Sequence, residues 1–187
     1  MRLFVALDLR EDVREKVREL INQLRPASRN ARWVRPESMH VTLKFIGHAA
    51  PEKLEAIRAA LASVRSSEPV ELQFRGIGFF PNERSPRVIW CGMTASANLA
   101  PLAADIERVL EVLGIARESR DFVPHLTLAR FNSPEKSGDL VRRVNESRSR
   151  EFGSASEKEF HLFESALHRS GAEYRRLATY PFVRGPA

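Results

Sequence analysis

Hydrophobic positions along the chain repeat with the period of a strand in some segments and with that of a helix in others. The two-residue period and the β-forming residues predict strands over 2–9, 40–47, 70–80, 85–93, 125–131, 159–167 and 173–182. Apolar stripes at helical spacing predict helices over 13–24, 51–64 and 99–113. Ser133 as N-cap and Pro134 in the first turn predict the start of a fourth helix. Predicted strands and predicted helices therefore follow one another along the whole chain, with some strands consecutive, which is typical of an α+β protein.

One strand-and-helix pattern occurs twice. Residues 40–53 read HVTLKFIGHAAPEK and residues 125–136 read HLTLARFNSPEK, so both copies join a His-x-Thr-Leu strand to a Pro-Glu-Lys helix start. No linker rich in glycine, serine or proline separates the copies. We therefore expect residues 1–187 to form a single bilobal domain, whose equivalent strands lie side by side across a cleft.

Each motif places an imidazole and a hydroxyl on one face of its strand. Because side chains alternate across a strand, His40 and Thr42 share a face, as do His125 and Thr127 in the second copy. The same alternation turns Arg130 toward the core. Arg130 is expected to reach the His-Thr face only if the strand bulges or ends before it.

The charge of the chain indicates a class of partner. The formal net charge is +6, and a basic surface attracts polyanions such as RNA.

No apolar run approaches the roughly 18 residues of a membrane span, and the opening segment is too charged for a signal peptide. The single cysteine, Cys91, excludes an internal disulfide and a cysteine-built metal site. We expect a cytoplasmic protein with no membrane contact and no obligate protein partner.

Two histidines and two threonines allow several chemistries. Catalytic zinc normally needs three protein ligands, and neither motif offers an adjacent carboxylate or a histidine at helical spacing. Nucleophilic catalysis needs an activated serine or cysteine, but Cys91 lies in an apolar strand. Paired acid–base catalysis fits better, because the imidazole pKa is ordinarily about 6.5 and threonine hydroxyls can bind an anion between the rings. A single His-x-Thr pair is more often structural, but its repetition favours a shared site for a phosphodiester.

The HVTL and HLTL segments resemble the duplicated His-x-Thr motif of the 2H phosphoesterase superfamily. Their surroundings resemble one branch of it, the RNA 2′,3′-cyclic phosphodiesterases, also called 2′–5′ RNA ligases. The segments that carry this resemblance are RLFVALDL, ARWVRPESMHVTLKFIG, SPRVIWCGM, FVPHLTLAR and SALHRSGAEY. It extends over nearly the whole chain. It implies two antiparallel sheets with flanking helices, related by a pseudo-twofold axis, and an active-site cleft between them.

The resemblance also implies a role for each motif residue. His40 would be the acid that protonates the departing 3′ oxygen, and His125 the base that activates the attacking water. Thr42 and Thr127 would bind the non-bridging phosphate oxygens, and Arg130 would contact substrate phosphate. The substrates would be RNA ends that carry a 2′,3′-cyclic phosphate, or cyclic nucleotides, and the product a 2′-phosphomonoester. Neither a metal nor a cofactor would be needed.

Two other functions remain open at this point. The first is ATP-independent 2′–5′ RNA ligation, which is formally the reverse reaction and uses the same residues. The second is a module that binds a nucleotide or RNA without turnover, although binding alone does not need a pair of histidines.

The sequence also predicts the environment of several side chains outside the motifs. Lys44 shares its strand face with His40, and we expect its ammonium group to be solvated. Four aromatic residues are expected to pack in the core rather than to stack on a base: Trp33, Phe45, Phe79 and Trp90. Three further histidines are expected on loops or strand surfaces: His48, His161 and His168.

Overall fold

The computed structural model describes residues 1–28, 30–119, 122–133, 137–168 and 171–182. Its strands are β1 (Arg2–Leu7), β2 (Ala31–Trp33), β3 (Val41–His48), β4 (Val70–Phe80), β5 (Val88–Ala95), β6 (His125–Phe131), β7 (Glu151–Glu157), β8 (Glu159–His168) and β9 (Gly171–Pro181). Its α-helices are α1 (Glu11–Leu24), α2 (Leu54–Ala62), α3 (Leu99–Glu111) and α4 (Gly138–Glu146). In the described part of the chain, no helix is long and apolar enough to cross a membrane.

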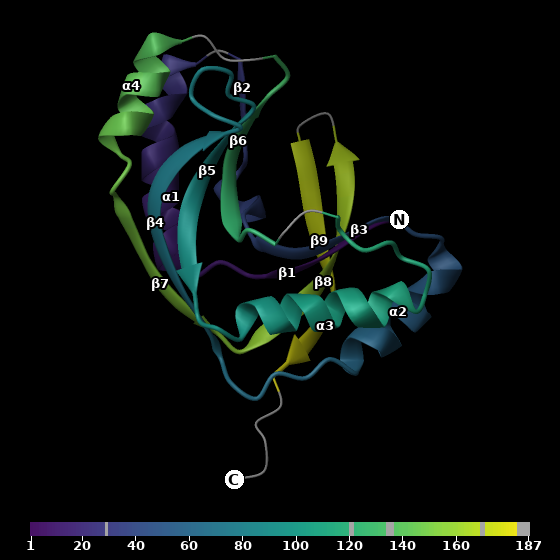
Figure 1. Ribbon diagram of the computed structural model, residues 1–187. Helices are drawn as coiled ribbons and strands as arrows, with labels where there is room; N and C mark the ends of the chain where they lie inside the picture. Colours follow the sequence, from purple (N-terminus) through teal and green to yellow (C-terminus); the bar gives the residue numbers. More distant parts are fainter. Residues whose placement is uncertain (29, 120–121, 134–136, 169–170, 183–187) are drawn as a thin grey trace.

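The strands form two antiparallel sheets. Sheet A has the order β3-β1-β8-β9, and sheet B has the order β2-β6-β5-β4-β7. Helices α2 and α3 pack against sheet A, whereas α1 and α4 pack against sheet B (Figure 1). The predicted α+β architecture of two antiparallel sheets with flanking helices is confirmed.

The faces of β1 show how sheet A separates its core side from its open side. Leu3, Val5 and Leu7 belong to the main apolar core, whereas Phe4 and Ala6, which alternate with them, point to the opposite face. The main core is one cluster that joins the helices to both sheets. Because the helices occupy the core side of sheet A, the face that carries Phe4 is free to line a site.

Some elements differ from the sequence prediction. The short strand β2 and the strand β7 were not predicted, since β7 (EFGSASE) has few apolar residues to mark it. The predicted cap of the fourth helix is wrong. The helix begins at Gly138, and its N-cap is Ser137, whose hydroxyl accepts a hydrogen bond from the Leu140 amide at 3.2 Å. Pro134 lies outside the described residues.

Both motif strands contain one extra residue directly after the threonine. In β3, Thr42 pairs with Ala6 and Lys44 pairs with the adjacent Val5, so Leu43 is the additional residue. In β6, Thr127 pairs with Trp90 and Ala129 pairs with Ile89, which leaves Leu128 without a partner position. These are β-bulges, and each reverses the alternation of side chains beyond it.

The bulge at Leu43 turns Lys44 inward. Lys44 pairs with the core residue Val5, and only 3% of its side chain is exposed. Its ammonium group donates hydrogen bonds to Glu107 Oε2 at 2.6 Å and to the Ala116 carbonyl at 2.6 Å. The prediction of a solvated lysine is therefore wrong. Lys44 instead ties β3 to α3 and to the segment that follows it.

Replacement of Lys44 by methionine tests this buried ion pair. Lys44→Met should destabilise the protein by about 3 kcal/mol, because it leaves the Glu107 carboxylate poorly solvated and unpaired. Arg108→Met, which removes an exposed ion pair with Asp105 from the same helix, should cost far less. Urea unfolding followed by circular dichroism gives both values. Equal losses in the free energy of unfolding would show that the buried ion pair stabilises the protein no more than an exposed one does.

Candidate active site

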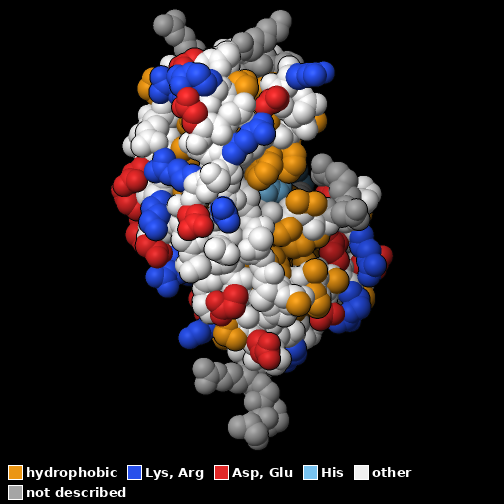
Figure 2. All heavy atoms as spheres, turned by 60° about the vertical axis from the view of Figure 1, so that its left-hand side comes forward, with side chains coloured by type: hydrophobic (Ala, Val, Ile, Leu, Met, Phe, Trp, Pro, Cys, Tyr) orange, Lys and Arg blue, Asp and Glu red, His pale blue; other side chains and the backbone are white. Residues whose placement is uncertain are grey.

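The His-Thr faces of the two motif strands border a common recess. Strands β3 and β6 come from different sheets and approach each other. Thr42 pairs with Ala6, so its side chain lies on the open face of sheet A. Figure 2 shows a histidine at the base of a recess that hydrophobic side chains border. We call this recess the cleft.

His40 is held in an aromatic surround. Its ring stacks on Phe4 with centroids 4.5 Å apart and meets Tyr174 edge-on at 5.1 Å. Phe163 stacks on Phe4 at 5.2 Å, and its ring centroid lies 6.3 Å from that of His40. The imidazole of His40 is thus packed against side chains from β1 and β9, with β8 close by, and is only partly exposed.

His125 is also supported by aromatic side chains. Phe80 meets its ring edge-on at 5.4 Å, and Trp90 stacks on Phe80 at 5.2 Å. A β-carbon at Gly78 would lie 2.6 Å from the Trp90 ring, so only glycine lets this indole lie against β4. The geometry of His125 therefore depends on residues of two neighbouring strands, β4 and β5.

The two imidazoles make the same hydrogen bond. Nδ1 of His40 lies 3.0 Å from the Ser38 carbonyl, and Nδ1 of His125 lies 2.9 Å from the Val123 carbonyl, in each case two residues earlier. A carbonyl oxygen only accepts, so Nδ1 must be the protonated nitrogen. The Nε2 atom of each ring is then free to take up a proton, or to donate one when the ring is charged.

The surroundings of His40 strongly affect its protonation. Burial lowers the pKa of His40 to about 4, against an opposing effect of the hydrogen bond to Ser38 and of the Asp8 carboxylate. Asp8 is itself paired with Arg14 at 3.2 Å and with Arg176. With the cleft empty, His40 is therefore neutral at pH 7.

The structure brings the five sequence-predicted residues to the same region. His125 and Thr127 share a face of β6, and the bulge at Leu128 returns Arg130 to that face, where its side chain is exposed. Burial raises the pKa of Tyr174, the residue that packs against His40, and the positive charges of Arg2 and Arg130 partly oppose this rise. Arg130 therefore faces the cleft, which the simple alternation of the strand did not predict.

The other aromatic residues divide into two groups. Phe79 and Trp33 pack on the core as predicted. The prediction is wrong for Phe45, which is 56% exposed and pairs with Phe4 on the open face of sheet A. It is also wrong for Trp90, which shares the cleft face of sheet B with Thr127. Phe45 and Arg130 occupy equivalent positions of the repeat, three residues after the motif threonine.

One further histidine also differs from expectation. His161 is buried rather than on a surface, and its Nδ1 lies 3.0 Å from the Thr179 hydroxyl. His48 is exposed, as expected. The prediction for His168 concerns a side chain outside the described part of the structure.

Sequence reasoning missed Phe4 and Tyr174, which pack on His40, Asp8, whose carboxylate acts on its charge, and Arg176, which pairs with Asp8. The alternation of β1 puts Phe4 and Ala6 on one face and extends to Asp8, so this grouping was visible in the sequence. What the sequence did not indicate was that this face, rather than the other, borders the cleft. Tyr174 and Arg176 come from β9, far along the chain, and no local pattern links them to His40.

Other chemical groups lie away from the cleft. Cys91 is buried on the core side of β5, and burial raises the pKa of its thiol to about 12. Within the described residues, no group of three His, Cys, Asp or Glu side chains could hold a metal ion.

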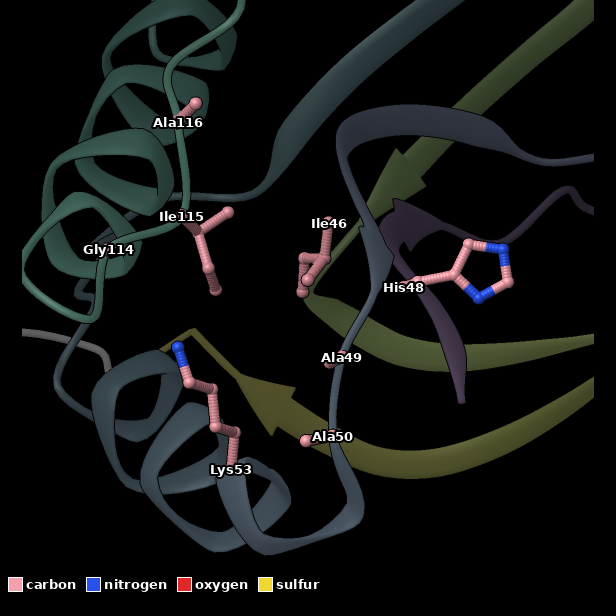
Figure 3. Close-up of a pocket in the computed structure, with 8 residues that line it drawn as sticks. All are labelled: Ile46, His48, Ala49, Ala50, Lys53, Gly114, Ile115 and Ala116. Atoms are coloured by element: carbon pink, nitrogen blue, oxygen red, sulfur yellow. The ribbon is translucent and has the colours of Figure 1, made fainter.

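A cavity of about 430 Å³ lies between the end of β3, the start of α2 and the segment after α3, and none of the five predicted residues lines it. Figure 3 shows Ile46, Lys53 and Ile115 around this cavity, with His48 directed away from it.

Comparison with known proteins gives consistent results. The family model of LigT-like phosphoesterases matches residues 7–90 and 93–174. A protein of Archaeoglobus fulgidus named RNA 2′,3′-cyclic phosphodiesterase is 37% identical over 96% of this chain and 99% of its own length. A protein of the same name from Methanothermobacter thermautotrophicus is 33% identical over 96% of this chain and 98% of its own.

Solved structures agree with this fold. The crystal structure of a Thermus thermophilus protein superposes with a TM-score of 0.81, at 31% identity and with full coverage of both chains. Escherichia coli LigT in complex with 3′-AMP superposes with a TM-score of 0.80, at 27% identity and with 97% of each chain covered. The duplicated motif, the paired sheets and these matches place the chain in the LigT-like phosphoesterase family of the 2H superfamily.

Proposed function

We propose that this protein hydrolyses the 2′,3′-cyclic phosphate ends of RNA to 2′-phosphomonoesters by paired histidine catalysis. The observation that carries the proposal is the matched hydrogen bond from each Nδ1 to a backbone carbonyl, which presents two Nε2 atoms for proton transfer. The names of the relatives support the substrate class. A binding module would have no need for two histidines held in this way.

The proposed reaction balances with these groups alone. His125 Nε2 takes a proton from water as the water oxygen attacks phosphorus. The bond from phosphorus to the 3′ oxygen breaks, and protonated His40 gives its Nε2 proton to that oxygen. Thr42 and Thr127 donate hydrogen bonds to the non-bridging oxygens, and Arg130 binds substrate phosphate from the same strand as His125. Proton exchange with solvent then restores both rings.

The low pKa of His40 sets a condition on this mechanism. A general acid must carry its proton, yet burial keeps His40 neutral near pH 7 while the cleft is empty. A bound phosphate is an anion beside the ring and favours the charged imidazolium. Substrate binding would therefore raise the pKa of His40 and favour its protonated form, which the departing 3′ oxygen needs as its proton donor. A neutral His40 also suits the opposite assignment, so the two roles need a direct test.

The pKa of His40 is expected to differ between the free protein and its complex with a phosphate ligand. In the free protein the pKa of His40 should lie near 4, and a bound nucleoside 2′-phosphate should raise it by about 1–3 through the charge of the phosphate. NMR titration of the imidazole C–H signals measures both states. The exposed His48 serves as the control and should not respond to the ligand. A pKa of His40 that does not change on binding would mean that the phosphate lies elsewhere.

Substitution of each histidine tests the two roles. His40→Ala and His125→Ala should each lower kcat by about 10²–10⁴, because each removes one partner in proton transfer. A cyclic substrate with sulfur in place of the departing 3′ oxygen needs no protonation of its leaving group. It should restore most of the activity of His40→Ala but not that of His125→Ala.

The matched control is His48→Ala, at the exposed last position of strand β3, which begins directly after His40. This variant should keep the rate of the unsubstituted protein. Rescue of His125→Ala by the sulfur substrate would reverse the assigned roles. Losses below tenfold for both His40→Ala and His125→Ala would exclude the two-histidine mechanism.

Independence from metal ions is a separate prediction. Hydrolysis of a nucleoside 2′,3′-cyclic phosphate should continue at the same rate in EDTA, because proton transfer and hydroxyl donors carry the proposed chemistry. Chromatography of the products should show the 2′-phosphate isomer. Loss of activity in EDTA that zinc or magnesium restores would contradict the prediction.

A further inference from the structure

Arg14 is a buried arginine of α1 that lies outside the proposed mechanism. Only 10% of its side chain is exposed. Its guanidinium donates hydrogen bonds to the Pro36 carbonyl at 2.5 Å, to the Leu9 carbonyl at 2.7 Å and to the Asp8 carboxylate at 3.2 Å. Glu11 lies 3.1 Å from its Nε and, together with Asp8, balances its charge. Because the planar guanidinium binds these partners at once, it is fixed in one position.

The Pro36 carbonyl belongs to the short turn that precedes the first motif histidine. This turn is the 3₁₀ helix η2 (Pro36–Ser38), and the Met39 amide that follows it donates to the same Pro36 carbonyl at 3.1 Å. The Met39 N–H and the Ser38 carbonyl are the two ends of one planar peptide unit, so fixing one end fixes the other. The Ser38 carbonyl is the group that accepts the hydrogen bond from His40 Nδ1 at 3.0 Å. The guanidinium on α1 is thus linked to the imidazole through a single peptide unit.

The second motif fixes the corresponding peptide unit in another way. His125 Nδ1 lies 2.9 Å from the Val123 carbonyl, and the peptide unit of that carbonyl ends at Pro124. Proline has no N–H, and its ring fixes φ near −65°. The covalent structure therefore restricts the peptide that orients His125. Met39 occupies the equivalent position of the first motif, so the peptide of Ser38 relies on hydrogen bonds for its position.

A second arginine of α1 contacts the same turn in a different way. Arg18 pairs with the Glu37 side chain at 3.0 Å, and both side chains are more exposed than that of Arg14. An exposed ion pair between long side chains restrains little. Arg14 instead binds the backbone of the turn, and it does so out of solvent, where a hydrogen bond is stronger. The contact made by Arg14 is therefore the one suited to fix the turn.

We propose that Arg14 is a positioning residue that acts on His40 through η2. The proposal rests on the proposed function, in which Nε2 of His40 must face the departing 3′ oxygen. While the guanidinium holds the Pro36 carbonyl, the Ser38 carbonyl stays in place to accept from Nδ1, and the ring keeps its orientation. Without the guanidinium the turn loses this support, and the neutral ring takes up both tautomers and more than one orientation.

The tautomer of His40 tests the proposal without a measurement of activity. Nitrogen NMR at about pH 8, where an imidazole of ordinary pKa is neutral, identifies the protonated ring nitrogen. His40 should show only the Nδ1–H tautomer in the unsubstituted protein and a mixture of both tautomers in Arg14→Met. His125 is the internal control and should keep its Nδ1–H tautomer in both proteins. A single Nδ1–H tautomer of His40 in both proteins would overturn the proposal.

The rate of turnover gives a second readout. Arg14→Met should lower kcat for a nucleoside 2′,3′-cyclic phosphate by about 10–100-fold, because a small displacement of a catalytic group is costly. KM should stay within about twofold, since Arg14 makes no contact with substrate. Arg14→Lys keeps the charge beside Asp8 but offers one ammonium group in place of the planar fork. It should stay folded, lose kcat by about tenfold and show the same mixture of His40 tautomers.

Arg18→Met is the matched control, because it removes an equal charge from the same helix and a contact with the same turn. It should leave kcat and the tautomer of His40 unchanged. Equal losses of kcat in Arg14→Met and Arg18→Met would overturn the proposal, since charge rather than geometry would then explain them. A kcat within about threefold of the unsubstituted value, in any folded Arg14 variant, would overturn it as well.

A purely structural role for Arg14 gives a different set of results. It lowers Tm while kcat per folded molecule and the tautomer of His40 stay unchanged, and this outcome would overturn the proposal. The same holds if neither Arg14 variant folds. A loss confined to KM would place Arg14 in substrate binding and would also overturn the proposal. Absence of hydrolysis by the unsubstituted protein would instead overturn the proposed function, while the tautomer measurement would still decide the role of Arg14.

Discussion

The extra residue that directly follows the threonine of each motif strand is the constraint on which the cleft depends. A regular strand would send the position three residues after the threonine into the core. The bulges at Leu43 and Leu128 place two consecutive side chains on the core side and return the next one to the cleft. The Val34 amide donates to the Leu128 carbonyl at 2.9 Å, so the irregular backbone of β6 does not lose its hydrogen bond. The cleft thereby gains Phe45 on one wall and Arg130 on the other.

The repeat supplies symmetry of position but not of environment. Both imidazoles are oriented by a carbonyl two residues earlier, which is a property of the local chain. The residues around them come from unrelated segments: Phe4 and Tyr174 pack on His40, whereas Phe80 packs on His125. Because burial and neighbouring charges set a pKa, the packing around His40 gives this copy of the motif a lowered pKa that the motif alone does not specify. A duplicated scaffold can in this way supply two unlike partners for proton transfer.

Much of the fold could be predicted, and the candidate site residues could be proposed, because residue type and spacing are local features of the chain. The two-residue period marks the strands that bury one face, and the apolar stripes mark α1, α2 and α3. The repeated His-x-Thr frame pairs His40 with His125 even though the two lie 85 positions apart in the chain (125 − 40). Strand β7 was not predicted because its side chains show little alternation of apolar and polar residues. The start of α4 was predicted at the wrong residue because more than one serine in that segment is suited to cap a helix.

The sequence by itself determined the elements, the repeat and the chemical groups of the site, since these depend on residue type and spacing. The tertiary structure decided which way the side chains beyond each motif point. The alternation of a strand holds only while its register with the partner strand is regular, and that register belongs to the pair rather than to either sequence. Lys44, Phe45 and Arg130 all lie beyond a bulge, so all three differ from the pattern of an isolated strand. The contact of Arg14 with the Pro36 carbonyl, and the aromatic residues around His40, likewise arise only when distant segments pack together.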